Sequence, residues 1–595
     1  MNSPWRLLVV WTVMAAGAVR AIVLPATETA RTAEKEVALP PMLVVASRLD
    51  WVHGEAPGFE VLSCCSKDAT ELFVQRISQC MAELASLVPE EFLLHASEPT
   101  LLILVPPARE QAMAAEMAKM MTSVAVSMNT APHLRLTDVD STAMYVVVDS
   151  APREWLTGDS RGLGPRYLYF TLSPDFVRSL IQMRQPTVPD WCAVGLAGLF
   201  GSGDDQAPPP ADGARLTRVI PGWYGPTNVP DADADRIASL AFNPDPWISR
   251  LDADVLRDNG DAPRPLLPMQ ELFAGRPAAG KSPDYQKVWE AQSELFVRWA
   301  LSGKTPGGSA AFWRFARLAT RQAVTEELFQ SCFGLDYADA RDALSDYLPE
   351  ALRNRVPWPG PVSLPEPPEL RAATQSEIDR IKGEWGRRVL RPVRSNCPDL
   401  LHFYVDQAKK ALQGAFERGE RDPRLVGTLG LLRLDTGEEA GARQALEEAV
   451  AAGATRPLVL VELARLRLKE YLQHPTAAPG NLGEDQAANI MSLIRKALAQ
   501  QPPLRGAYSV AADVMSHLGR DPNPAERAML DGGAQLYAAD TALVLQAAKW
   551  DARAGDRDSA HRLIELGLWQ SADPVIRGKL VALDQLLSAP AAGRR

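Results

Sequence analysis

Small residues recur at a spacing of 34 residues in the C-terminal third of the chain, and this spacing restricts the fold more than any other feature. Ala408 and Ala442 are 34 positions apart, as are Ala415 and Ala449. Small residues at a fixed period let paired helices approach closely, and a period of 34 residues is typical of a helix–turn–helix unit. Each unit buries its apolar face only against its neighbours, so the spacing predicts a solenoid of helix pairs. A helical bundle without repeats is the alternative.

The residues around these positions resemble the tetratricopeptide repeat. Two stretches match that family's pattern, at about 429–449 and 547–567. The positions expected at helix contacts and turns are Ala408, Ala415, Leu429, Gly430, Gly437, Ala442, Ala449, Ala548, Gly555, Ala560 and Gly567. The resemblance implies an all-α solenoid over residues 399–590, whose concave surface binds a protein or peptide segment.

The N-terminal half mixes strand-like and helix-like segments. The pattern predicts strands at 59–62, 101–105, 144–148 and 167–170 and helices at 68–87, 110–128 and 174–183. This order is typical of an α+β domain with a small sheet, which we place at residues 56–200.

A mainly helical region follows this domain. After a loop at 201–235, apolar periodicity predicts helices near 269–275, 285–302, 309–319, 324–332 and 337–349. We therefore expect a helical second half at 201–355. Residues 22–55 are expected to be a flexible lead-in, and residues 356–398 a proline-rich linker with a connecting helix.

The segment from Pro189 to Ala197 has the form Pro-x-Trp-x-x-Val-Gly-x-Ala. It resembles the P-x-W-x-x-E-G-x-A segment of gluzincin (peptidase MA-like) metallopeptidases, which implies a thermolysin-like (zincin) α+β domain with a helical subdomain. In that comparison the glutamate zinc ligand of the family falls on Val194. The family's HExxH helix falls on Pro174–Arg178, with Asp175 at the general-base position.

None of the residues at the ligand positions can hold zinc. Valine has no donor atom, and neither proline nor arginine replaces a neutral imidazole. Without a metal to lower the pKa of a bound water, Asp175 alone is a feeble base. Its simpler role is that of a first-turn acid that complements the helix dipole, and Arg178 lies at i+3 from it, either paired or solvated. We therefore expect neither a cofactor nor a bound metal.

Residues 1–21 have the organisation of an export signal. Arg6 precedes an apolar run from Leu7 to Val19, and small residues follow near Ala21. The run is short for a membrane span of roughly 20 residues. We expect a cleaved signal peptide, a periplasmic or secreted protein, and no membrane span after cleavage. An uncleaved signal that anchors the chain is the alternative.

Charge and cysteine spacing exclude other classes. A net charge of −10 without a Lys/Arg stripe gives no basis for nucleic-acid binding. Six cysteines without a CxxC pair disfavour a structural zinc site. We expect them to be small buried apolar residues, with a bridge between Cys80 and either Cys64 or Cys65 as the alternative.

The combined interpretation is an exported pseudo-peptidase without catalysis that binds a protein or peptide through its tetratricopeptide repeats. One alternative is an active zinc metallopeptidase with displaced ligands, in which His95, His133 or another pair of histidines converges with carboxylates on one cleft. Another is an envelope assembly module in which the solenoid holds the partner.

Overall fold

The computed structural model describes most of the chain from residue 51 onward. The described residues are 51–93, 96–105, 133–147, 174–182, 186–199, 248, 251, 265–275, 282–353, 366–396, 398–473, 481–571 and 573–588. The export signal, the helix predicted at 110–128, the strand predicted at 167–170 and the loop at 201–235 lie outside these residues. So do His95 and most of the proline-rich stretch after residue 353.

A mixed six-stranded sheet forms the centre of the N-terminal half, with strand order β4-β5-β3-β2-β1-β6. The strands are β1 (Val52–Ala56), β2 (Phe59–Ser63), β3 (Thr100–Val105), β4 (His133–Thr137), β5 (Thr142–Val147) and β6 (Arg371–Ala372). β2, β3 and β5 are parallel, whereas β1 is antiparallel to β2 and β6, and β4 is antiparallel to β5. Gly58, with φ of 79°, supplies the left-handed position in the tight β1–β2 turn.

Helix α1 (Lys67–Leu87) covers one face of this sheet. Ser66 caps the helix, since its side chain accepts a hydrogen bond from the Ala69 N–H. Alternate residues of the strands, such as Val61 and Leu102, join the apolar residues of α1 in one buried core. The side chains that alternate along each strand and those that repeat along one side of α1 therefore face each other in this core.

Helix α13 (Gln375–Asn396) covers the opposite face. Trp385 of α13 lies against Tyr145 of β5, with ring centroids 5.9 Å apart, and Arg380 bonds Glu60 of β2. The sheet is thus enclosed by α1, which follows β2 closely in sequence, and by α13, which lies some 300 residues later.

The described helices between β5 and β6 pack around one aromatic core. They are α4 (Pro174–Gln182), α5 (Asp190–Gly198), α8 (Met269–Phe273), α9 (Pro283–Leu301), α10 (Gly308–Ala319), α11 (Glu326–Phe333) and α12 (Tyr337–Arg353). α5 lies against α9 so closely that a Cβ on Gly195 would be 2.4 Å from the Ser293 carbonyl oxygen. Trp191 and Trp289 are fully buried there and Trp299 is 4% exposed. The thermolysin-like (zincin) assignment of this half stays a prediction.

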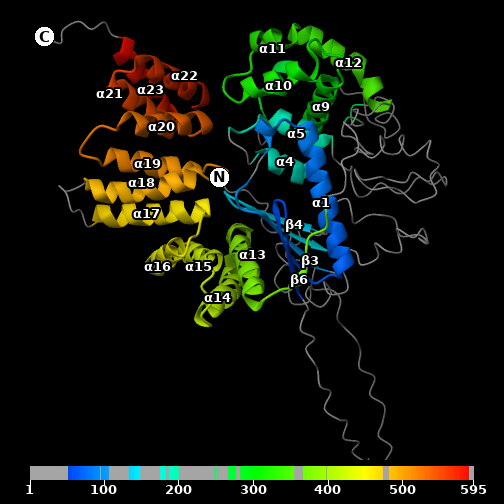
Figure 1. Ribbon diagram of the computed structural model, residues 1–595. Coiled ribbons are helices and arrows are strands. Elements are labelled where there is room, and N and C mark those ends of the chain that lie inside the picture. The colour runs from blue at the N-terminus through cyan, green and yellow to red at the C-terminus, as the bar shows by residue number, and fades with distance from the viewer. Residues whose placement is uncertain are drawn as a thin grey trace, which may run out of the picture. The chain divides into compact units, whose positions relative to one another are not determined.

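An all-α, tetratricopeptide-like solenoid follows (Figure 1). Its helices after α13 are α14 (Leu401–Glu417), α15 (Pro423–Asp435), α16 (Glu439–Ala451), α17 (Pro457–Gln473), α18 (Glu484–Leu498), α19 (Arg505–Ser516), α20 (Pro524–Leu536), α21 (Thr541–Ala554), α22 (Arg557–Gln570) and α23 (Pro574–Ser588). They pack as the successive pairs α13–α14, α15–α16, α17–α18, α19–α20 and α21–α22, with α23 against the last pair.

The first helices of successive pairs lie side by side. α13 contacts α15, α15 contacts α17, α17 contacts α19, and α19 contacts α21. Among the described helices, the second helices of neighbouring pairs contact each other less, with α20 and α22 as the pair that comes closest to the first helices in this respect. The first helices are therefore the closely spaced ones, as expected for the inner side of a curved stack.

The small residues singled out in the sequence lie at the helix contacts and turns. Ala408, Ala415, Ala442, Ala449, Ala548, Ala560 and Leu429 are at most 1% exposed. A Cβ on Gly430 would be 2.7 Å from the Leu446 side chain, and one on Gly567 would be 2.8 Å from the Leu580 side chain. Gly437 and Gly555 both have φ of 83°, which favours glycine after a helix.

Two predicted boundaries need correction. The flexible lead-in at 22–55 is wrong for Val52–Glu55, which belong to β1 because all four pair with β2, and the first two also pair with β6. The helix expected within residues 356–398 is α13 (Gln375–Asn396), but its role as part of a linker is wrong, because it covers the sheet and forms the first helix pair with α14.

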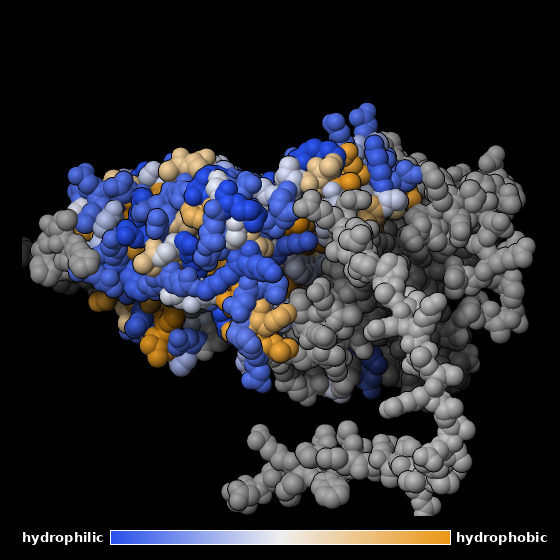
Figure 2. All heavy atoms as spheres, turned by 90° about the horizontal axis from the view of Figure 1, so that it is seen from below, coloured by the Kyte–Doolittle hydropathy of each residue, from blue (hydrophilic) through white to orange (hydrophobic). Residues whose placement is uncertain are grey.

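The surface of the described residues carries both hydrophilic and apolar side chains. In the view of Figure 2, hydrophilic side chains cover most of the coloured surface, with apolar patches between them. Within the described residues, no helix combines the length and the apolar character needed to cross a bilayer.

The contact between α13 and α14 can be tested with a glycine. A Cβ on Gly383 would be 2.3 Å from Leu412 Cγ, the branch point of a buried side chain. Gly383→Ala should therefore lower the free energy of unfolding by about 1–3 kcal/mol through overpacking. Gly532→Ala in α20 is the control, because nothing lies within 4 Å of its Cβ. It should raise stability by about 0.5–1 kcal/mol in denaturant unfolding. Equal effects of the two changes would contradict the packing.

Candidate functional site

The positions that resemble a zinc site lie on α4 and α5, which pack together. Pro174 begins α4, the side chain of Asp175 lies outside the described part, and Arg178 is half-buried. Val194 is 2% exposed within α5, where every residue from Trp191 to Gly198 is buried in the apolar core. An apolar side chain in a closed core offers a cation no ligand, so Val194 has a packing role.

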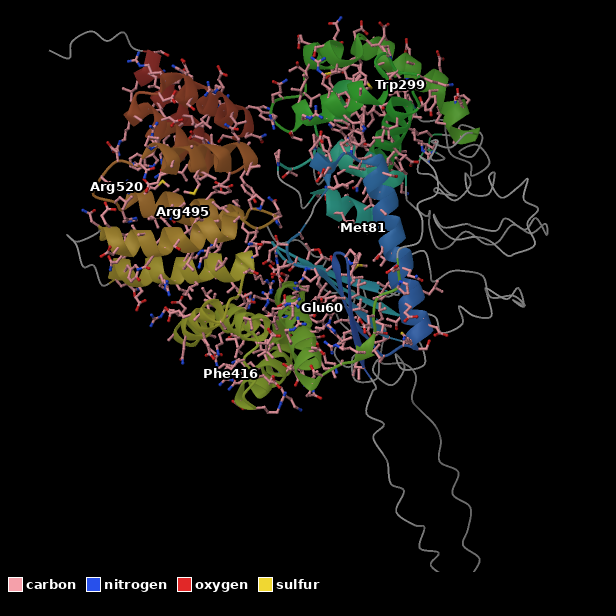
Figure 3. All side chains as sticks on the ribbon, viewed as in Figure 1. Glu60, Met81, Trp299, Phe416, Arg495 and Arg520 are labelled. Atoms are coloured by element: carbon pink, nitrogen blue, oxygen red, sulfur yellow. The ribbon has the colours of Figure 1, made fainter. Side chains whose placement is uncertain are left out.

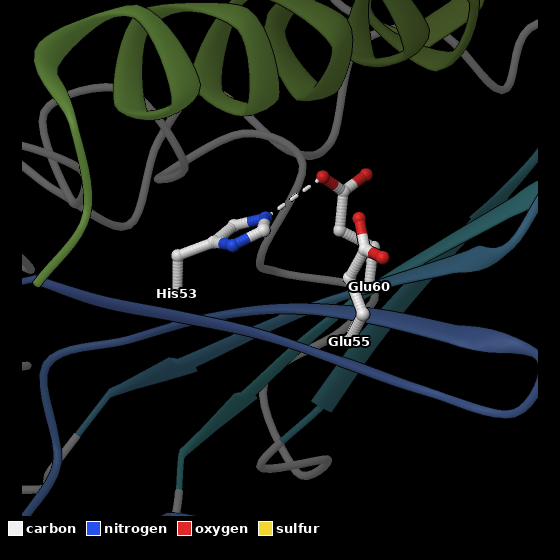
Figure 4. Close-up of side chains that lie close together, drawn as sticks. All are labelled: His53, Glu55 and Glu60. Carbon is white, nitrogen blue, oxygen red and sulfur yellow. Dashed lines mark hydrogen bonds and ion pairs between the residues drawn. The ribbon is translucent and has the colours of Figure 1, made fainter. Parts of the chain in front are cut away.

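The structure brings a different set of ligand-type residues together. His53 of β1 and Glu60 of β2 point toward one another, with Nε2 and Oε1 2.9 Å apart, and Glu55 lies beside them (Figure 4). One donor atom from each of these three residues lies within 4.8 Å of the others. An imidazole and two carboxylates are a ligand set that zinc accepts.

Glu60 is, however, already neutralised by arginines. Arg380 of α13 bonds both of its oxygens, and Arg424 of α15 donates from Nη2 to Oε2 at 2.6 Å. Figure 3 labels Glu60 within the side chains of the protein. Burial alone would raise the pKa of Glu60, but the hydrogen bond with His53 and the charges of Arg380 and Arg424 lower it to about 2. A metal ion would have to displace guanidinium groups, so the arrangement favours an ion-pair centre over a metal site.

A second carboxylate group lies in the turn between β4 and β5. Asp140 is fully buried, and Arg456 binds it with two donors, Nε at 2.9 Å and Nη2 at 3.0 Å. Asp140 Oδ2 also accepts a hydrogen bond from the Leu458 N–H, in the first turn of α17, at 3.2 Å. The carboxylate thus caps a solenoid helix from outside that helix, where the helix dipole favours negative charge.

Glu384 of α13 lies at the centre of the arginines. It accepts hydrogen bonds from Arg388 Nε at 2.7 Å, from Arg456 Nη1 at 3.1 Å and from Arg387 Nη2 at 3.2 Å. Burial opposes its ionisation, yet the charges of Arg387, Arg456 and Arg388 hold its pKa well below the usual range. Arg387 also bonds Asp138 of the β4–β5 turn. These buried charges fasten the sheet to α13 and α17.

A cavity of about 470 Å³ opens beside this network. Its walls are the amino ends of β2, β3 and β5, the end of β1, and parts of α13, α15 and the α16–α17 turn. The lining includes Glu55, Phe59, Glu98, Leu101, Ser141, Arg380, Glu384, Arg388, Arg424, Thr428, Arg456 and Val459. Several charged side chains and an apolar wall therefore meet in one space, which we take as the candidate site.

Sequence reasoning did not find this site. Glu60 and Arg424 are 364 positions apart, and Asp140 and Arg456 are 316 positions apart. Single charged residues at such distances carry no local pattern. The one available signal was an isolated acidic residue within a mainly apolar strand, such as Glu60 within Phe59–Leu62.

Comparison with known proteins gives weak likenesses to repeat proteins. No protein-family model matches the chain, and no curated protein matches it significantly. Among solved structures, the chain is similar to the thermophilic tetratricopeptide protein TTC0263 of Thermus thermophilus at 16% identity, over 34% of this chain and 98% of that one, with a TM-score of 0.24. It is similar to YrrB, a tetratricopeptide protein with an unusual peptide-binding site, at 12% identity over 36% and 100%, with a TM-score of 0.24.

A third likeness is to pilF of Pseudomonas aeruginosa, at 12% identity, over 36% of this chain and 92% of that one, with a TM-score of 0.25. All three scores are low. The description of the solenoid therefore rests on the helix pairs of this chain itself, which form an all-α, tetratricopeptide-like stack.

The cap on α17 can be tested by removing one charge. Asp140→Asn keeps the shape of the side chain but leaves Arg456 without its bidentate partner. The free energy of unfolding should fall by about 3 kcal/mol, because a buried charge loses one of its counter-ions. Glu439→Gln is the matched control, since Glu439 and Lys469 form an exposed pair in which both side chains are over half exposed. This change should cost less than about 1 kcal/mol. Similar losses in urea unfolding would contradict the assignment.

A separate pair of carboxylates lies between α20 and α21. Burial and the charge of Asp551 raise the pKa of Asp531 to about 6, and Arg527 offsets this only in part. Asp551 itself is 1% exposed. In the unfolded chain an aspartate ionises near pH 3.9, so the folded protein binds the extra proton between about pH 4 and 6.

Stability of the solenoid should therefore fall as pH rises from about 4 to about 6. Asp531→Asn removes the titrating group and should stabilise the protein by about 1 kcal/mol at pH 7.5, with little effect at pH 4. The measurement is the unfolding midpoint across this pH range. The exposed Asp521→Asn is the control and should leave the pH dependence unchanged. A stabilisation by Asp531→Asn that is the same at both pH values would contradict the assignment.

Proposed function

We propose that the chain is a non-catalytic scaffold that binds a protein or peptide segment along the inner side of its solenoid. The side-by-side packing of the first helices α15, α17, α19 and α21 carries this proposal. Such packing creates one continuous surface across several repeats, and an extended segment can contact successive helices of it.

Polar residues on this surface supply donors and acceptors. Arg465 of α17 is half exposed, and one of its terminal nitrogens would be 3.2 Å from a Cβ on Gly506 of α19. Asp513 of α19 is exposed and lies close enough to Arg465 for an electrostatic interaction between the two side chains. The boundary between α17 and α19 therefore offers both signs of charge to a bound segment.

We also propose that the N-terminal half is a pseudo-peptidase and that the protein is exported. The buried Val194 and the residues Pro174 and Arg178 support the loss of zinc chemistry. The proposed export to the periplasm or exterior rests on Arg6 and the apolar run after it. An envelope assembly role is compatible with the same scaffold function.

A zinc enzyme with displaced ligands is a second candidate, because His53, Glu55 and Glu60 lie together. The arginines on Glu60 argue against it. Zinc titration followed by calorimetry separates the two. We expect the native chain to show no stoichiometric zinc binding that depends on His53. The titrations of the native chain and of His53→Gln should therefore look alike. Tight one-to-one binding that depends on His53, together with peptide hydrolysis, would replace the scaffold proposal.

Peptide binding gives the direct test. The full chain should bind a subset of random 12-residue peptides on an array, with dissociation constants of roughly micromolar order, typical of transient recognition. Arg465→Ala should weaken the bound peptides about 5- to 10-fold in fluorescence polarisation, since a charge-assisted contact is lost. Lys496→Ala, an exposed change on the second helix α18, is the matched control. Uniform absence of binding, or equal effects of both variants, would reject the inner surface as the binding site.

A further inference from the structure

We propose that the 470 Å³ cavity receives a lysine or arginine side chain of the bound protein segment and that Glu98 pairs with its charge. The inference rests on the proposed scaffold function and names the chemistry that one part of the partner must carry. It places this contact at the start of the solenoid, between α13, α15, α17 and the amino ends of the parallel strands.

The arginines that line the cavity already have carboxylate partners. Arg380 and Arg424 bond Glu60, and Arg388 bonds Glu384. Arg456, the fourth lining arginine, bonds Asp140 and Glu384. The positive charges of the wall are thus neutralised from within the protein, so the wall keeps little attraction for an anionic ligand.

Glu98, in contrast, has no hydrogen bond or ion pair with another residue in the part of the chain that the structure describes. It precedes β3 and faces the cavity together with Glu55. Burial raises the pKa of Glu98. The charges of Arg456 and Arg424 lower it and those of Asp140 and Glu384 raise it, and the effect of burial prevails. An incoming cation would relieve this unfavourable environment of the carboxylate.

The rest of the lining suits a long basic side chain. Phe59, Leu101 and Val459 form an apolar wall that can hold the methylene stem. Thr428 and Ser141 add polar residues to the lining of the cavity. A cationic head group with an apolar stem therefore matches both the charge and the polarity of the space, whereas an acidic side chain would meet an unpaired carboxylate.

Three short probes test the charge preference. They are acetylated and amidated alanine pentapeptides with a central lysine, glutamine or glutamate, titrated into the full chain by NMR. The lysine peptide should bind about 10-fold more tightly than the glutamine peptide, as expected for one charge-assisted contact. Glu98→Gln should remove this difference, and Glu98→Lys should shift the preference to the glutamate peptide. Glu439→Gln, on the exposed face of α16, should leave it intact.

Each other outcome overturns the inference. These outcomes are no binding of any pentapeptide, equal binding of the lysine and glutamine peptides, tighter binding of the glutamate peptide to the native chain, and a preference that survives Glu98→Gln. Unchanged unfolding midpoints show that the variants fold. If 12-residue peptides still bind in a manner that depends on Arg465, the scaffold proposal stands while the cavity inference falls.

Discussion

The carboxylates of Glu60 and Asp140 are buried where the sheet meets the solenoid, and arginines from α13, α15 and the α16–α17 turn neutralise them. A buried carboxylate without a counter-ion is very unfavourable, so the sheet and these helices are stable only when they are in contact. Because Glu60 belongs to β2 and Asp140 to the β4–β5 turn, the network fixes the sheet against the solenoid at more than one point. The loop before β3 adds a third, where Ser97 and Gln501 exchange two hydrogen bonds.

This contact between the sheet and the solenoid changes how the chain divides into domains. The prolines after residue 356 suggested that two independent halves are joined by a linker. α13 instead belongs to both halves, since its Trp385 packs on the sheet and its Gly383 packs on α14. A truncation before α13 would expose one face of the sheet, and one after it would remove the first partner of α14. The candidate site exists only because the halves are joined, since its walls come from both.

Local patterns in the sequence predicted much of the fold. They did not reveal contacts between residues that are far apart in the chain. The alanines around Ala408 and Ala442 predicted paired helices because close approach requires small residues at a fixed spacing. Continuous apolar runs predicted β3 and β5, and the mainly apolar segment Phe59–Leu62 predicted β2. β1 and β4 were missed because short strands with polar residues, such as His53 in β1, show no clear alternation. The candidate site could not be predicted, because the pairing of Asp140 with Arg456 depends on tertiary structure alone.

The same buried charges explain why binding suits this site better than hydrolysis. A catalytic metal needs ligands that are free to coordinate it and an open position for water. Here the imidazole of His53 is hydrogen-bonded to Glu60, and guanidinium groups hold the carboxylate of Glu60, so both are fixed as structural groups. Arginine is well suited to this task, because its planar fork satisfies two carboxylate oxygens at once. The wall of the cavity is therefore rigid and internally neutral, and the carboxylate of Glu98 is left as the group that can distinguish one partner from another.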